Sequence, residues 1–214
     1  MYSRLPAAQC DWSEENMKYV MCFFPWIGAV IGVLCLGWNY LAGWLGFHAP
    51  LRNVILMLIP LVVSGGIHLD GLLDTADAMS SWRPRERRLE ILKDSHAGAF
   101  AIIICCAYFF LLYGVMDMMQ GELVVIYAFA FVISRSFSAF SVVTFPKASV
   151  SGTVAGFSKT AQARMIQTTA SVYILLCAGL MLYLNPVYGI CALVGAAVIY
   201  RNCQIVETLA AFTG

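Results

Sequence analysis

Charged residues are scarce in this chain. Only 12% of its 214 residues are Asp, Glu, Lys or Arg and 61% are hydrophobic, whereas soluble globular proteins are roughly 25% charged. This composition excludes an ordinary soluble domain. The net charge of +1 gives no indication of a nucleic-acid partner, and we expect none. We therefore expect a single membrane domain over residues 1–214, with the lipid bilayer as its partner.

The sequence also lacks cysteine pairing motifs and the pattern of a signal peptide. The eight cysteines have no CxxC spacing and mostly lie in apolar runs, which is typical of free thiols packed as small hydrophobic groups. No basic segment followed by a short apolar run opens the sequence, so we expect no cleaved signal peptide. No internal repeat or second domain is evident.

Long apolar runs are what the sequence does have. A bilayer core needs about 20 helical residues, and most of the runs approach or exceed that length. They predict an all-α, polytopic membrane protein with about six transmembrane helices, near 19–47, 52–67, 99–116, 123–145, 168–184 and 187–200. In the first run, Gly28 and Gly32 form a pair of small residues that would let a neighbouring helix approach closely.

Lys and Arg are concentrated in two long connections, 82–97 and 146–167. The short turns at 117–122 and 185–186 carry none. The positive-inside rule therefore places both long connections, and both termini, in the cytoplasm.

Acidic residues gather on that same side, in a motif over residues 65–98. Its first part, 65–79, reads GGIHLDGLLDTADAM. On a helix Asp70, Asp74 and Asp77 share one face, where their like charges repel unless a cation lies between them. Carboxylates in this arrangement suit Mg²⁺, which can bridge a pyrophosphate. The alternative is a solvated helix whose acids pair with three nearby arginines, Arg83, Arg87 and Arg88.

The charged tail that follows offers further candidates. Lys93 and Ser95 are candidates to bind phosphate oxygens, and Asp94 is a candidate metal ligand or general base. The alternative is a solvated face that only sets the topology. The sequence does not decide whether His68 is a metal ligand, a base or a residue that forms hydrogen bonds at the membrane interface.

Arg135 lies near the middle of the fourth run, about ten residues or ~15 Å from its cytoplasmic end. An ionisable residue inside the membrane is a functional candidate by default. Ser134, Ser138 and Ser141 add a polar stripe beside it. Phosphate binding, pairing with an aspartate and a purely structural pairing all stay open.

Several of these stretches together resemble the cobalamin synthase (adenosylcobinamide-GDP ribazoletransferase) family. The main signature is HLDGLLDTAD at 68–77, followed by LEILKDS at 89–95 and by Gly98. Supporting matches are SRLP at 3–6, FPWIG at 24–28 and RSFS at 135–138. The sequence departs from the family pattern after Cys203, where members carry a Gly-Gly-x-Thr-Gly-Asp type turn and another helix.

The resemblance implies a Mg²⁺-dependent enzyme of the bacterial inner membrane with its active site toward the cytoplasm. Such an enzyme joins adenosylcobinamide-GDP, a corrinoid nucleotide, to α-ribazole or its 5′-phosphate. The products are adenosylcobalamin or its 5′-phosphate, and GMP. A ribose hydroxyl attacks the phosphorus on the cobinamide side. Because the corrinoid is large and the spans are few, a homo-oligomer is one way to enclose it.

The resemblance also implies roles for the site residues. Asp70, Asp74 and Asp77 would hold Mg²⁺ on the pyrophosphate, and Asp94 would activate the hydroxyl. Positive charge for the reacting phosphate and further substrate contacts would come from Lys93, Arg135, His68, Arg88, Ser95 and Lys159.

Two other function classes remain as alternatives. Another membrane transferase with a pyrophosphate-linked donor, of the CDP-alcohol phosphotransferase or prenyltransferase type, also places aspartates on membrane helices, although its motif spacing is absent here. A cation- or proton-coupled transporter would show ionisable residues deep in several helices, and here only Arg135 is plainly deep.

Overall fold

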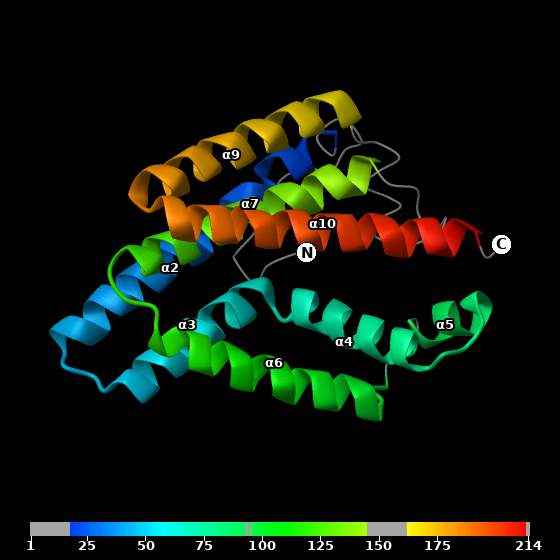
Figure 1. Cartoon of the computed structure of the whole chain (residues 1–214), viewed down its shortest axis with the longest axis horizontal. Helices are drawn as coiled ribbons and strands as arrows, with labels where there is room; N and C mark the ends of the chain where they lie inside the picture. The colour runs from blue at the N-terminus through cyan, green and yellow to red at the C-terminus, as the bar shows by residue number, and fades with distance from the viewer. Residues whose placement is uncertain (1–17, 93, 95, 145–161, 213–214) are drawn as a thin grey trace. The chain divides into compact units, whose positions relative to one another are not determined.

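The computed structural model describes residues 18–92, 94, 96–144 and 162–212. Every regular element in these ranges is helical, which confirms the all-α prediction (Figure 1). In chain order the helices are η1 (Val20–Phe23), α2 (Phe24–Trp44), α3 (Ala49–Ser64), α4 (Ile67–Ser80), α5 (Arg85–Ile91), α6 (Ala99–Asp117), α7 (Glu122–Thr144), α9 (Ala163–Leu184) and α10 (Pro186–Phe212).

Four stretches of helix are long and apolar enough to cross a membrane: Val20–Trp44, α6, α7 and α9. The pair α3 and α4 makes a fifth only if its two bent halves cross as one span. The sixth expected span lies in α10, in which Pro186–Val198 forms an apolar helical segment. The described residues thus form a multi-pass membrane protein with four to five candidate spans, which agrees with the predicted polytopic architecture.

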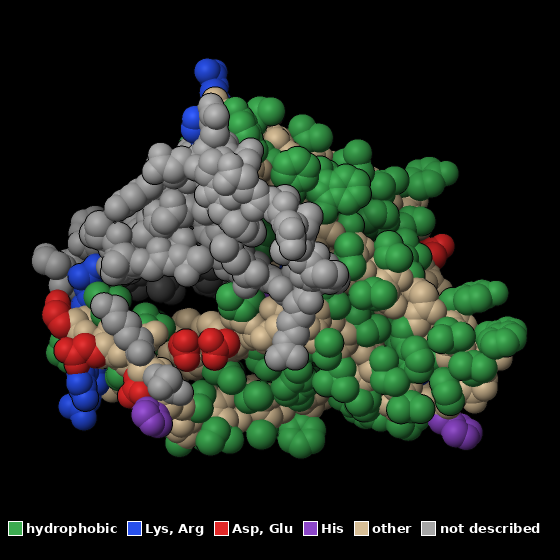
Figure 2. Space-filling model, turned by 180° about the vertical axis from the view of Figure 1, so that it is seen from behind, with side chains coloured by type: hydrophobic (Ala, Val, Ile, Leu, Met, Phe, Trp, Pro, Cys, Tyr) green, Lys and Arg blue, Asp and Glu red, His purple; other side chains and the backbone are tan. Residues whose placement is uncertain are grey.

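Large apolar side chains cover much of the described surface (Figure 2). On α6, for example, Phe110 is 77% exposed and Leu111 is 72% exposed. Such a surface would be costly in water but is the ordinary outer face of a helix surrounded by lipid.

The described helices form two compact units. The first is Trp38–Met119, which holds the end of α2 and all of α3 to α6. The second combines the described residues of 18–37 with those of 120–212.

In the first unit, two glycines stop α3 and redirect the chain. Gly65 and Gly66 have φ values of 67° and 83°, a left-handed conformation that glycine adopts without steric cost. The Gly66 N–H donates to the Leu61 carbonyl (3.0 Å), as is usual at a helix end capped by glycine. The chain then turns by 91° into α4. The acidic stretch therefore begins a helix of its own instead of continuing the second apolar run.

Helix α6 packs against both halves of this bend, α3 and α4 (Figure 1). At its C-terminal end Arg52 donates to the Met116 carbonyl (3.3 Å), and Asn53, only 1% exposed, donates to Asp117 (3.4 Å). A cation is favourable there because the helix dipole is negative at that end. Trp38 joins α2 to the same place by donating to the Arg52 carbonyl (3.1 Å).

In the second unit, α7 packs against α9 and α10. The close approach predicted for Gly28 and Gly32 is confirmed, and the neighbour is α7. A Cβ atom on Gly28 would lie 2.4 Å from the Phe131 carbonyl oxygen, and one on Gly32 would lie 2.9 Å from that of Ala128. Only glycine leaves room for the α7 backbone at these two positions.

We expect Gly66→Ala to destabilise the first unit by about 1–2 kcal/mol, the usual cost of a left-handed residue that carries a Cβ. Backbone conformation would be the cause, because the added Cβ meets no atom nearer than 3.9 Å. Unfolding by SDS in mixed micelles, followed by far-UV circular dichroism, measures the effect. The matched control is Gly114→Ala on α6, where a Cβ meets open space. Equal stability of the two variants would contradict the account of the bend.

Candidate active site

The candidate site is the acidic face of α4. This helix runs unbroken from Ile67 to Ser80, so the spacing of Asp70, Asp74 and Asp77 does place them along one face. Asp70 is exposed, and the other two are half-buried. Burial, and then the charges of Asp70 and Asp77, raise the pKa of Asp74 above its ordinary value. A nearby cation would relieve this unfavourable electrostatic arrangement.

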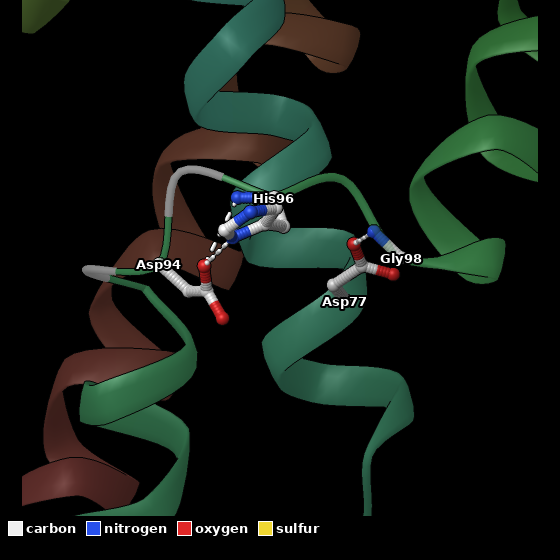
Figure 3. A network of polar contacts seen from close by, with 4 residues as sticks. All are labelled: Asp77, Asp94, His96 and Gly98. Atoms are coloured by element: carbon white, nitrogen blue, oxygen red, sulfur yellow. Dashed lines mark hydrogen bonds and ion pairs between the residues drawn. The ribbon is translucent and has the colours of Figure 1, made fainter.

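Asp77 differs from its two neighbours in what it contacts. Its Oδ2 accepts a hydrogen bond from the Gly98 N–H (2.5 Å) (Figure 3). Its Oδ1 accepts one from the Ala101 N–H (2.8 Å). These donors belong to the start of α6, where the first amide groups of a helix have no partner within the helix. Asp77 therefore caps α6 from a different helix.

With Asp77 turned to α6, no three Asp, Glu, His or Cys side chains converge on one point among the residues that the structure describes. The donor set still fits Mg²⁺. This ion commonly binds through one or two carboxylates and completes its coordination with water and substrate phosphates. Asp70 and Asp74, one helical turn apart, provide two carboxylates of that kind.

The structure gives no support to the alternative in which the arginines neutralise this face. In the described ranges, Arg87 pairs with Glu90, and His96 lies within ion-pair distance of Asp94. Arg88, predicted to bind substrate, directs Nη1 to the Met79 sulfur (3.7 Å) and so links α5 to the end of α4. No ion pair joins the carboxylates of α4 to Arg83, Arg87 or Arg88 in the part of the chain that the structure describes.

Asp94 lies beyond α5 and is held by a residue to which the sequence reasoning assigned no role. Its Oδ1 lies 2.7 Å from His96 Nδ1 and accepts a hydrogen bond from the His96 N–H (3.0 Å) (Figure 3). These hydrogen bonds lower the pKa of Asp94. The spacing of two residues was a signal for the pair, because an Asp side chain often bonds the backbone two residues ahead. Lys93 and Ser95, on either side, lie outside the described residues.

Two of the other predicted substrate-binding residues lie on described helices. His68 is exposed in the first turn of α4. Arg135 lies on α7 in the second unit, where it is 6% exposed, with Cζ 5.5 Å from the centre of the Phe131 ring. That geometry is a cation–π contact. Lys159 lies outside the described residues.

The serine stripe on α7 lines a cavity of about 550 Å³. Ser134, Ser138 and Ser141 face it together with apolar residues of α7, α9 and α10, whereas Arg135 is not part of its wall. The stripe and the arginine, neighbours in the sequence, thus have different surroundings.

Comparison with known proteins supports the resemblance seen in the motifs. An adenosylcobinamide-GDP ribazoletransferase from Lachnoclostridium phytofermentans is 40% identical over 92% of this chain and 75% of its own length. Proteins of the same name from Clostridium botulinum and Listeria monocytogenes are 37% and 39% identical over 53% and 54% of this chain. The matches cover only 45% and 46% of those two relatives. No solved structure was found to be similar.

The profile of one protein family, described as cobalamin-5-phosphate synthase, matches residues 1–214. Because this match covers the whole sequence and the Lachnoclostridium relative covers nearly all of it, the chain belongs to the cobalamin-5-phosphate synthase family.

Proposed function

We propose that this chain is an adenosylcobinamide-GDP ribazoletransferase. It would join adenosylcobinamide-GDP to α-ribazole, or to α-ribazole 5′-phosphate, and release GMP. The observation that carries the proposal is the acidic face of α4 in a chain of this family. Among the described residues, the nearby Arg87 and His96 pair with Glu90 and Asp94 and not with the carboxylates of this face. A pyrophosphate donor needs a site that can hold a divalent cation, and that face offers one.

Mg²⁺ is the proposed cofactor, with Asp70 and Asp74 as its protein ligands. When bound, it would neutralise charge on the pyrophosphate and on the departing phosphate. Water and phosphate oxygens would complete its coordination, since Mg²⁺ seldom binds through protein groups alone.

The transfer would proceed by attack of the ribose hydroxyl oxygen on the phosphorus attached to cobinamide. A new P–O bond forms there, the P–O bond to GMP breaks, and GMP leaves with the bridging oxygen. Asp94 would accept the hydroxyl proton, and His96 would hold Asp94 ionised and oriented for this task. A carboxylate in this place is a weak base, so its main contribution would be to orient the hydroxyl.

Positive and polar groups would bind the remainder of the substrates. The candidates from the motif over residues 65–98 are His68, Arg88, Lys93 and Ser95, and those from the second half of the chain are Arg135 and Lys159. Arg135 would contribute a fixed positive charge if a phosphate reaches it, because an arginine stays protonated even when buried.

The enzyme would work in the bacterial inner membrane with the acidic face toward the cytoplasm. Support comes from the basic run that follows α4, with Arg83, Arg85, Arg87 and Arg88 in six residues. Such runs stay on the cytoplasmic side of spanning helices.

Purified protein in lipid nanodiscs should release GMP from adenosylcobinamide-GDP only when α-ribazole and Mg²⁺ are present. Asp70→Asn and Asp74→Asn remove a ligand charge and should each lower kcat/KM by about 100-fold or more, in the range of lost charge-stabilising groups. Glu86→Gln, an exposed acid of α5, is the matched control and should retain the wild-type rate. If both aspartate variants kept that rate as well, the metal assignment would be wrong.

The pH profile tests the role of Asp94. His96→Ala removes the side-chain hydrogen bond that lowers the pKa of Asp94, so this carboxyl would protonate at a higher pH. Since the proposed role needs the ionised form, the acid limb of the kcat/KM profile should move to higher pH. His48→Ala, far along the sequence from the motif, serves as the control. Coincident acid limbs for His96→Ala and wild type would count against Asp94.

A further inference from the structure

The three aspartates of α4 do not have equivalent surroundings. Both carboxylate oxygens of Asp77 accept hydrogen bonds from backbone N–H groups at the start of α6, at 2.5 Å from Gly98 (Figure 3) and at 2.8 Å from Ala101. Two electrostatic effects stabilise a carboxylate that accepts hydrogen bonds from N–H groups at a helix N-terminus. The bonds are charge-assisted, and the positive end of the helix dipole faces the charge.

Gly98, at the start of α6, leaves space for this contact because it has no side chain. Gly98 is the N-cap residue, with φ −83° and ψ 176°, a conformation open to any residue. Backbone strain therefore does not require glycine there. A Cβ atom would, however, lie 2.7 Å from Oδ1, 2.8 Å from Oδ2 and 2.9 Å from Cγ of Asp77. Gly98 leaves the room that the Asp77 carboxylate occupies.

The contact joins two elements that are otherwise connected through the long segment 81–98. Ala101, the second donor, is 1% exposed, so this end of the contact is buried between packed elements. Helix α4 carries Asp70 and Asp74 on the same face as Asp77. Fixing Asp77 to α6 therefore fixes the direction in which the other two carboxylates are presented.

We propose that Asp77 is a positioning residue that ties α4 to the N-terminus of α6, with Gly98 as its required partner, and that it is not a ligand of the cation held by Asp70 and Asp74. This inference rests on the proposed function for the identity of the cation. It assigns the metal site two protein carboxylates and gives the third a separate task.

Hydrogen exchange tests the tie in wild-type protein. Amide exchange in the peptide that spans 97–103, read by mass spectrometry, should be slow without metal and should speed up in Asp77→Ala, because the amides of Gly98 and Ala101 lose their acceptor. Saturating Mn²⁺, a probe for the Mg²⁺ site, should leave the wild-type exchange slow. A rise with Mn²⁺ to the rate seen in Asp77→Ala would mean that Asp77 leaves α6 for the metal, and the proposal would be overturned.

A matched pair of glycine variants tests the consequence for the site. Gly98→Ala displaces the Asp77 carboxylate while every acidic residue stays unchanged. It should weaken Mn²⁺ binding about 10-fold or more, as for other groups that orient metal ligands. Gly114→Ala, the same change in open space on the same helix, should bind Mn²⁺ like wild type. Both titrations use electron paramagnetic resonance of free Mn²⁺, and equal affinities for the two variants would contradict the proposal.

These readouts separate this inference from the proposed function. If wild-type protein bound no Mn²⁺, the metal site on Asp70 and Asp74 would fail. The exchange comparison between metal-free wild type and Asp77→Ala would still decide whether Asp77 ties α4 to α6. Conversely, intact Mn²⁺ binding with identical exchange in the two proteins would leave the metal site standing and overturn the tie.

Discussion

Carboxylates are expensive in hydrocarbon, and this constraint governs how the first unit folds. An apolar helix that simply continued past Ser64 would carry three aspartates along the direction of its span. Instead, Gly65 and Gly66 adopt left-handed conformations, and the chain turns by 91°. The turn separates an apolar helix from an acidic one, which allows a chain with only 12% charged residues to present a concentrated polar site.

A sharp bend needs support, and α6 provides it at both of its ends. Its N-terminal amides bond Asp77 of α4, and its C-terminal carbonyl at Met116 bonds Arg52 of α3. Each partner carries the charge that the local helix dipole favours. One apolar spanning helix is thereby joined to both arms of the bend through its own unpaired backbone groups. The geometry of the acidic face depends on these contacts between helices as much as on α4 itself.

Sequence patterns predicted the elements well and their connections poorly. Apolar runs gave the all-helical architecture, and the spacing of Asp70, Asp74 and Asp77 gave their shared face, since both depend only on local periodicity. Four to five of the about six predicted spans are candidates among the described residues. The cap on α6 was not predictable, because it joins residues that are 21 and 24 positions apart in the sequence.

The central claim is that a divalent cation binds the acidic face of α4 through two carboxylates. Anomalous scattering from Mn²⁺ in crystals of the protein grown from lipid would test it most directly. The account predicts a peak about 2.1 Å from oxygens of Asp70 and Asp74, the distance usual for such ligands, with Asp77 still bonded to the Gly98 N–H. A peak coordinated by Asp77, or one that lies on Asp94 and the acids of α5 instead, would contradict it.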